Sequence, residues 1–213
     1  MNEVVNNKEF NHLKIHTQYS ICEGALRTSE LAKYCKENKI KAAGLSDSNN
    51  LCGALEFSEL LAKSKTQPII GTQINIQYKE DYIGKISLIA KDLSGYKNLI
   101  KLSSKSFLEI KNDEIPHCQI EDLEKNFKGL ILLSGPIDGF FGGLFSKNLT
   151  DEIFLLLKKL KETYKNNLYL EIQRHDDLGE KLFEKFLLNL SEELELPIIA
   201  THEVFYLDKD MHE

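Results

Sequence analysis

The chain has 213 residues, 42% of them hydrophobic and 28% charged, with a formal net charge of −6. This length suffices for one full domain core, or at most for one and a half. The acidic balance argues against a protein whose main task is to grip phosphate backbones, although 27 lysines and arginines allow local basic patches. No apolar run approaches the roughly 18 residues that span a bilayer, so we expect no membrane contact.

Cysteine usage and the amino-terminal residues suggest a cellular compartment. The four cysteines are Cys22, Cys35, Cys52 and Cys118. They form no C-x-x-C pair, so a zinc ribbon is not expected, and the absence of a signal peptide indicates reduced thiols in a cytoplasmic protein. Residues 1–9 are polar and are interpreted as a short leader before a domain that spans 10–213.

A first strand is predicted around Leu13 and Ile15, which alternate with polar residues. The polar side of this strand would carry His12, Lys14 and His16, two residues apart. Two histidines and a lysine are costly to bury without partners, so other residues should face them.

Further elements alternate along the chain. Strands are predicted over residues 42–46, 68–77, 86–90, 130–133, 168–172 and 198–202. Helices are predicted over residues 28–38, 51–61, 94–107, 120–126, 150–164 and 178–194, the last with a Leu/Phe stripe expected to pack in the core. Several strands end on polar residues, namely Asp47, Gln73 and the pair His202-Glu203. In α/β folds, sites collect at such carboxyl ends.

Seven strands with helices between most of them imply a mainly parallel sheet, either open or closed into a barrel. The glycines between residues 135 and 143 indicate a loop or a broken helix. They form no phosphate cradle, because no Lys-Ser/Thr pair follows at the required spacing. Residues 211–213 look like the start of a helix without a C-cap, so we expect the chain to be a fragment of a longer one.

The run HLKIHTQYSICEGA, from His12 to Ala25, resembles the first motif of the PHP (polymerase and histidinol phosphatase) domain of bacterial DNA polymerase III alpha subunits. That motif is usually H-L-H-x-H-T/S-x-Y-S-x-x-D-G. Further matches, in the family's order, are LSDSNNLCGALEF, PIIGTQINI, AKDLSGYKNLIKLSSKSF, GLILLSG, YLEIQRH and LPIIATHEVFYLDKDMHE. The resemblance implies a distorted (β/α)7 barrel in which about nine ligands at the carboxyl ends of the strands hold up to three divalent ions for phosphoester hydrolysis.

Most of the implied ligands are altered in this chain. The corresponding positions carry Lys14, His16, Glu23, Ser48, Gln73, Phe107, Pro136, Glu203 and Phe205. His16 matches the pattern and two positions keep a carboxylate, whereas the other six have lost their usual donor; Gln73, for example, stands where the resemblance implies a glutamate. We therefore expect no metal and no catalytic residue in this domain. Instead, we predict a structural strand-tip cluster formed by His12, Lys14, His16, Glu23, Asp47 and Glu203.

Lys14 is the most informative of these replacements, because a permanent cation stands where the family pattern has a metal ligand. We hypothesise that Lys14 pairs with Glu203, Glu23 or Asp47 and neutralises the remaining carboxylates. An uncompensated buried carboxylate would otherwise cost several kcal/mol.

Single residues admit alternatives. His16 could be a residual ligand or a hydrogen-bonded core histidine, and for His12 we expect structural hydrogen bonding. Asp47 could position a nucleophile or cap a turn. Cys22 beside Glu23 could suggest a thiol nucleophile, but no histidine is fixed next to it. For His175 and His202 we expect surface or supporting roles.

Two functions remain. The leading one is a non-catalytic PHP domain that packs on the rest of a polymerase alpha chain and docks a proofreading exonuclease subunit. DNA and Mg²⁺ would then be bound only by the parent polymerase, a DNA-directed nucleotidyltransferase. The alternative is an active metal-dependent phosphoesterase or 3′–5′ exonuclease, which is favoured by His16, Glu23, Asp47 and Glu203.

Overall fold

The computed structural model of the chain describes residues 10–79, 82–111, 113–208 and 210. The predicted leader (residues 1–9) and the predicted helix start (residues 211–213) lie outside the described residues. None of the helices in the described part is both long and apolar enough to cross a membrane.

The strands of the described residues form one nine-stranded sheet. They are β1 (Lys14–Ile15), β2 (Ala42–Leu45), β3 (Gln67–Tyr78), β4 (Tyr82–Ala90), β5 (Cys118–Gln119), β6 (Leu130–Leu133), β7 (Leu168–Ile172), β8 (Ile198–Ala200) and β9 (Glu203–Val204). The seven predicted strands are therefore present, the last of them (predicted over residues 198–202) as β8, whereas β5 and β9 are additional.

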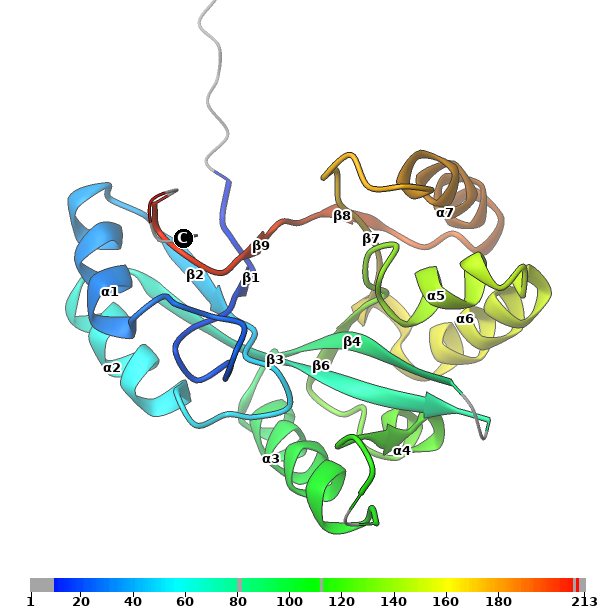
Figure 1. Cartoon of the computed structure of the whole chain (residues 1–213), viewed down its shortest axis with the longest axis horizontal. Coiled ribbons are helices and arrows are strands. Elements are labelled where there is room, and N and C mark those ends of the chain that lie inside the picture. Colours follow the sequence, from blue (N-terminus) through cyan, green and yellow to red (C-terminus); the bar gives the residue numbers. More distant parts are fainter. Residues whose placement is uncertain (1–9, 80–81, 112, 209, 211–213) are drawn as a thin grey trace, which may run out of the picture.

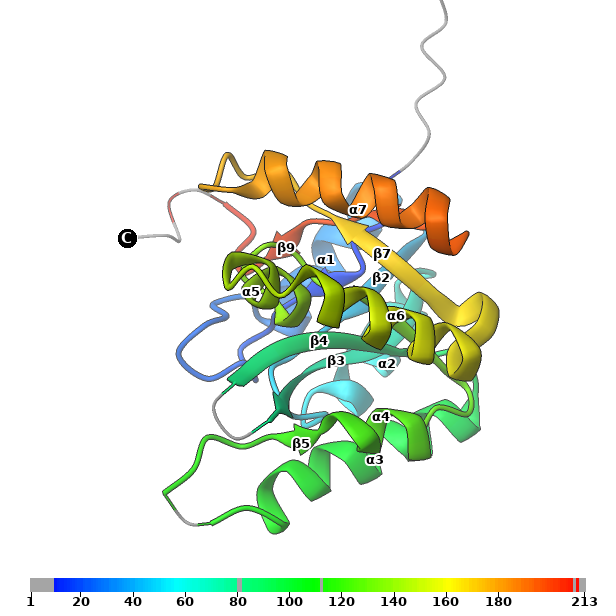
Figure 2. The ribbon, with the colours of Figure 1, turned by 90° about the vertical axis from the view of Figure 1, so that its right-hand side faces the viewer.

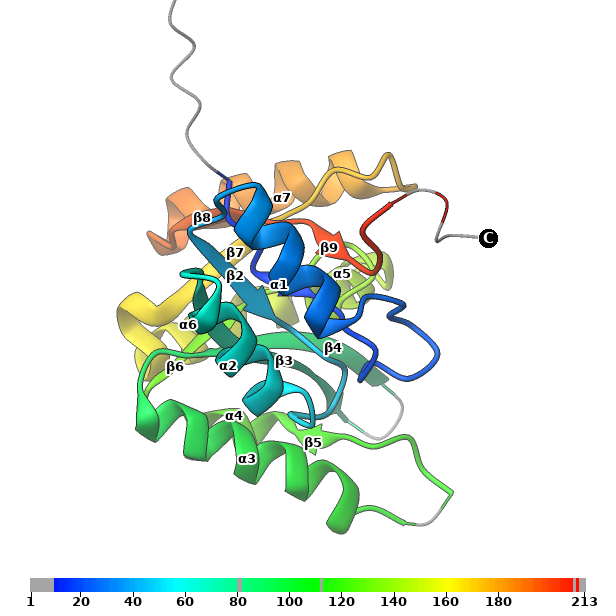
Figure 3. The same ribbon diagram turned by 90° about the vertical axis from the view of Figure 1, so that its left-hand side faces the viewer.

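Helices lie around this sheet (Figure 1). They are α1 (Thr28–Glu37), α2 (Ala54–Lys63), α3 (Leu93–Leu108), α4 (Ile120–Lys125), α5 (Phe140–Ser146), α6 (Thr150–Tyr164) and α7 (Glu180–Leu194), with a 3₁₀ turn, η1 (Lys165–Asn167), after α6. Figure 2 shows α5, α6 and α7 over one side, and Figure 3 shows α1 and α2 over another. The glycines between residues 135 and 143 predicted a loop or a broken helix, and the short helix α5 begins within this stretch.

The strands run in the order β8-β7-β6-β4-β3-β2-β1-β9, and β5 pairs with β3. The sheet is mainly parallel, as predicted, and the exception is β4, which is antiparallel to both β3 and β6. The reason is the connection between β3 and β4, which is only a few residues long. A parallel pair would need a crossover of a dozen residues or more, usually a helix.

The two end strands of this order are consecutive in the chain. Only Thr201 and His202 separate β8, which pairs with β7, from β9, which pairs with β1. The chain therefore steps from one edge of the sheet to the other at this point, which we call the seam (Figure 1). Residues of β1, β7 and β9 come together beside the seam, and the candidate site lies there.

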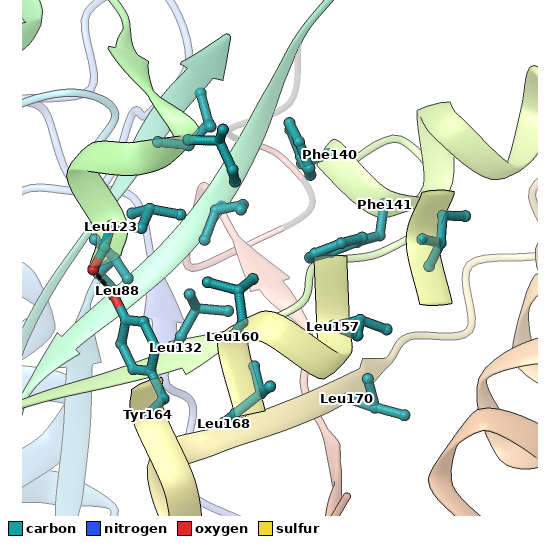
Figure 4. Close-up of a cluster of buried hydrophobic side chains, with 14 of the residues drawn as sticks. Leu88, Leu123, Leu132, Phe140, Phe141, Leu157, Leu160, Tyr164, Leu168 and Leu170 are labelled. Carbon is teal, nitrogen blue, oxygen red and sulfur yellow. Dashed lines mark hydrogen bonds between the residues drawn. The ribbon is translucent and has the colours of Figure 1, made fainter. Parts of the chain in front are cut away.

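The larger of two hydrophobic clusters lies under α3, α5, α6 and α7. Figure 4 shows Tyr164 at its edge, where the phenol donates a hydrogen bond of 3.0 Å to the carbonyl of Leu123. The predicted core stripe over residues 178–194 is partly wrong. The core face of α7 consists of Phe183, Leu187, Leu190 and Leu194, whereas Leu178 and Leu182 are 100% and 67% exposed.

Candidate functional site

Lys14 lies at the centre of the site. Its side chain is 1% exposed, and its Nζ atom lies 2.9 Å from Glu171 Oε1 and 2.5 Å from Glu203 Oε1. Burial by itself disfavours the ammonium form, but the charges of the two facing carboxylates outweigh this effect and raise the pKa of Lys14. The predicted ion pair between Lys14 and Glu203 is present, and Lys14 is charged at any physiological pH.

Glu203 is the second centre of the cluster. Besides Lys14, its carboxylate contacts His16 Nε2 at 2.8 Å and accepts a hydrogen bond of 2.8 Å from Gln73 Nε2. Burial would raise the pKa of this carboxyl, yet the hydrogen bond with His16 and the charge of Lys14 hold the pKa well below its usual range. Both carboxylate oxygens are therefore occupied by protein partners.

Glu171 completes the cluster, and the sequence reasoning missed it. Its side chain is fully buried on β7 and accepts hydrogen bonds from Gly135 N at 3.1 Å and Gln173 Nε2 at 2.8 Å, as well as a short one from Thr201 Oγ1. A signal was available, because Glu171 is the only charged residue in the run Leu168–Ile172. A carboxylate inside a buried strand requires a partner of opposite charge.

The other two acidic residues of the predicted cluster do not pair with Lys14. Asp47 accepts hydrogen bonds from Thr17 N at 2.7 Å, from Thr17 Oγ1 at 2.9 Å and from Ser20 Oγ at 2.7 Å, so it fixes the turn that follows β1. Glu23 pairs with Lys85 Nζ at 2.9 Å and accepts a short hydrogen bond from Ser48 Oγ. Burial opposes ionisation of Glu23, but the hydrogen bonds from Ser48 and Lys85 lower its pKa.

Of the three altered ligand positions that carry Phe or Pro, two lie beside the cluster and one lies away from it. Phe205 stacks on the His16 ring at a centroid distance of 4.5 Å and an interplanar angle of 16°. Pro136 lines a small cavity of about 80 Å³ beside Lys14, Gln73 and Glu203. Phe107, near the end of α3, is half-exposed and is not among the residues that line this cavity.

His12 does not join the cluster, contrary to the prediction. β1 begins only at Lys14, so the strand alternation does not extend back to His12. Its ring instead packs edge-on against Phe10 and lies 6.5 Å from the ring of His202, with Nδ1 buried and unpaired among the described residues. His202 in turn stacks on His175, and both of these rings are exposed.

The arrangement does not suit the metal cluster that the family pattern implies. An ammonium group lies 2.5 Å from one oxygen of Glu203, and an amide N–H is directed at the same atom. Neither group can coordinate a cation through nitrogen in these protonated forms. Within the described ranges, no three His, Cys, Asp or Glu side chains are placed to hold an ion together.

Comparisons with known proteins agree on one family. A family model described as "PHP domain" matches residues 12–175. The DNA polymerase III subunit alpha of Rickettsia felis is 37% identical over 205 residues, and that of Rickettsia prowazekii is 38% identical over 204 residues. Each match covers 96% of this chain but only 17% of the relative, so the chain spans about a sixth of the length of these relatives.

A solved structure supports the fold. A putative metal-dependent phosphoesterase from Bifidobacterium adolescentis superposes with a TM-score of 0.58 at 11% sequence identity, covering 92% of this chain and 87% of that one. At this identity the likeness concerns the fold alone. The family model that matches residues 12–175 shows that this α/β chain belongs to the PHP domain family.

Proposed function

We propose that this chain is a non-catalytic PHP domain of a replicative DNA polymerase III alpha subunit. The similarity to alpha subunits over 96% of the chain supports the parent protein. The parent would be a cytoplasmic DNA-directed DNA polymerase that binds DNA and uses Mg²⁺ on carboxylates outside these residues. The domain itself would act as a scaffold that packs on the remainder of the alpha chain and docks the proofreading exonuclease subunit.

The observation that carries the non-catalytic part is the position of the Lys14 ammonium between Glu171 and Glu203. In a metal-dependent hydrolase, clustered ions neutralise such carboxylates, activate water and stabilise the developing charge. Here a side chain supplies the positive charge. An ammonium group donates hydrogen bonds, but it cannot coordinate and activate a water molecule as a metal ion does.

Phe205 and Gln73 support the same proposal. Phe205 covers one face of His16 with a ring that has no donor atom. Gln73 supplies an N–H to Glu203 where the family pattern has a carboxylate, so it acts as a donor within the cluster. Each of these contacts stabilises the carboxyl ends of the strands without an ion.

The first experiment tests the absence of catalysis. The purified chain is dialysed against Zn²⁺ or Mn²⁺, its metal content is measured, and hydrolysis of bis(p-nitrophenyl) phosphate is followed with either ion present. We expect less than stoichiometric metal and no hydrolysis above the rate of the Lys14→Met variant. Stoichiometric metal together with turnover that this variant alters would refute the proposal.

The second experiment tests docking. The chain is mixed with the proofreading exonuclease subunit of its own organism and analysed by size-exclusion chromatography with light scattering. Co-elution as a complex supports the scaffold role. Two separate peaks, both for this chain and for the full-length alpha subunit, would refute exonuclease docking.

An active metal-dependent phosphoesterase is the second candidate. It is favoured by three retained side chains at the strand tips, namely His16, Glu23 and Glu203, and by the fold shared with the Bifidobacterium protein named above. The first experiment separates the two candidates. Metal-dependent turnover that is lost in both His16→Ala and Glu203→Ala would establish this alternative.

A further inference from the structure

The residues after the seam contact both the interior cluster and the outer surface. We call residues 201–208 the tail segment. Glu203 and Phe205 point to the interior, where they contact Lys14 and His16. Val204 and Leu207, on the other side, pack against the smaller hydrophobic cluster, which includes Leu31 of α1.

The main-chain support of the tail segment is small. β9 is two residues long and pairs only with β1 among the described strands. Beyond this pairing, His16 N donates to Val204 O at 2.8 Å, Ala25 N donates to Phe205 O at 2.9 Å, and Thr201 N donates to Ile172 O at 3.1 Å. By comparison, β3 and β4 pair over eight residues each.

The side chains of the tail segment therefore supply much of its attachment. Glu203 alone contacts Lys14, His16 and Gln73. Lys14 is part of β1, His16 directly follows β1, and Gln73 is part of β3. A hollow of about 290 Å³ lies between the tail segment and α1, lined by Ile15, Leu31 and Tyr34 on the far side. Movement of the tail segment would widen this hollow.

We propose that the tail segment is a latch that opens as a unit from the rest of the domain, with Glu203 as the residue that holds it shut. Opening would separate Glu203 from Lys14 and uncover the buried side chains of Ile15 and Leu31, next to Tyr34, which is already exposed. The interior ion pair and the outer groove are thereby coupled, because one residue contacts the first and its neighbours line the second. This inference does not depend on which of the two functions above the domain performs.

Local opening units are recognised by their short, weakly paired strands and by an opening free energy below that of global unfolding. The amides of His16 and Ala25 report on the latch, because their acceptors are tail carbonyls. Ser134 N, bonded to Tyr169 O, and Gln67 N, bonded to Lys41 O, report on the rest of the sheet.

Hydrogen exchange of the chain, measured by NMR over a range of low urea concentrations, tests the latch directly. In the unsubstituted chain we expect the His16 and Ala25 amides to exchange at least about tenfold faster than those of Ser134 and Gln67, with a weaker dependence on urea. Equal rates and equal urea dependence for all four amides would overturn the proposal without any variant.

A substitution then tests the role of Glu203. Glu203→Gln keeps the size of the side chain and removes its charge, and should accelerate exchange of His16 and Ala25 by a further factor of about ten relative to Ser134 and Gln67. The matched control is Glu184→Gln. It removes the carboxylate of Glu184, a residue of α7 away from the latch, which pairs with Arg174. An unchanged ratio in Glu203→Gln, or the same change in both variants, would overturn the assignment of Glu203.

Discussion

Replacing Lys14 with methionine tests the central ion pair most directly. Methionine keeps an unbranched stem of similar length and removes only the positive charge and its hydrogen bonds. Two carboxylates then remain without their cation: that of Glu171, which is fully buried, and that of Glu203, which is mostly buried. Removing one partner of a buried ion pair typically costs about 3–5 kcal/mol, because the other charge stays behind unpaired.

The local donors set the expected value within that range. Glu171 would keep its hydrogen bonds from Gly135 N, Gln173 and Thr201, and Glu203 would keep those with His16 and Gln73. These donors continue to stabilise the ionised carboxylates, so we expect the lower end, a loss of about 3 kcal/mol. For a chain of this length such a loss corresponds to a fall in Tm of roughly 6–12 °C.

The assay is urea and thermal unfolding followed by far-UV circular dichroism, with Lys85→Met as the matched control. Lys85 also pairs with a glutamate at the strand tips, Glu23, but both side chains are substantially exposed. Its removal should cost less than about 1 kcal/mol. If Lys14→Met is no more damaging than Lys85→Met, the claim that Lys14 neutralises a buried site is refuted.

The pH dependence of the same variant provides a second criterion. Without the ammonium, the pKa of Glu203 should rise from its lowered value toward and above the ordinary range, because burial then acts with less opposition. The variant can relieve its unpaired charge by taking up a proton as pH falls. The stability difference between the unsubstituted chain and Lys14→Met should therefore shrink between pH 8 and pH 5, and a constant difference would contradict the reasoning.

Further predictions concern pH, the α7 core and one glycine. The lowered pKa of Glu203 gives stability that is complete above the ordinary value of 4.5 and lost only as pH falls below it, and the raised pKa of Lys14 gives stability that is lost only as pH rises above 10.5. In urea titrations, ionisation of these two groups should therefore leave the free energy of unfolding of the unsubstituted chain unchanged from about pH 5 to pH 10; a decline within that window in the unsubstituted chain but not in Lys14→Met would contradict this. Leu187→Ala on the buried face of α7 should cost about 2–5 kcal/mol, whereas Leu182→Ala on the exposed face should change stability by less than about 0.5 kcal/mol; similar losses on chemical denaturation would count against the observed orientation of α7. Gly129→Ala should lower the unfolding free energy by at least about 2 kcal/mol, because φ is +70° at this position and an added methyl group would meet the Asp92 carboxylate that caps α3. A neutral effect in the same assay would refute the steric requirement for glycine here.

The order and type of most elements could be predicted from the sequence, because the strands are short apolar runs and the helices carry clear periodicity. The antiparallel placement of β4 was within reach, since no helix separates residues 68–77 from 86–90 and a short connection permits only a hairpin. The orientation of α7 could not be predicted from the sequence. Leucines at 182 and 187 are equally apolar, and only the three-dimensional packing decides that Leu187 is buried and Leu182 exposed.

The candidate site was partly predictable for a similar reason. The pairing of Lys14 with Glu203 follows from placing two strand ends side by side, which the strand pattern suggests. The contribution of Glu171 depends on the seam, where β7 and β1 approach each other without pairing directly, and sequence periodicity carries no information about that approach. The prediction that His12 joins the cluster was wrong, because the sequence shows the alternation but not the length of β1, which is set by its neighbours.

The replacements at the strand tips make sense only as a set. Gln73 donates an N–H to Glu203; a carboxylate there, as the family pattern has, would place a second negative charge beside Glu203. That repulsion would be tolerable with a divalent ion between the two groups, but a single ammonium already shared between Glu171 and Glu203 cannot offset it. Likewise, a histidine at position 14 would leave Glu171 without its cation. The replacements thus depend on one another, and this mutual dependence supports the proposed non-catalytic site more strongly than the loss of any one ligand.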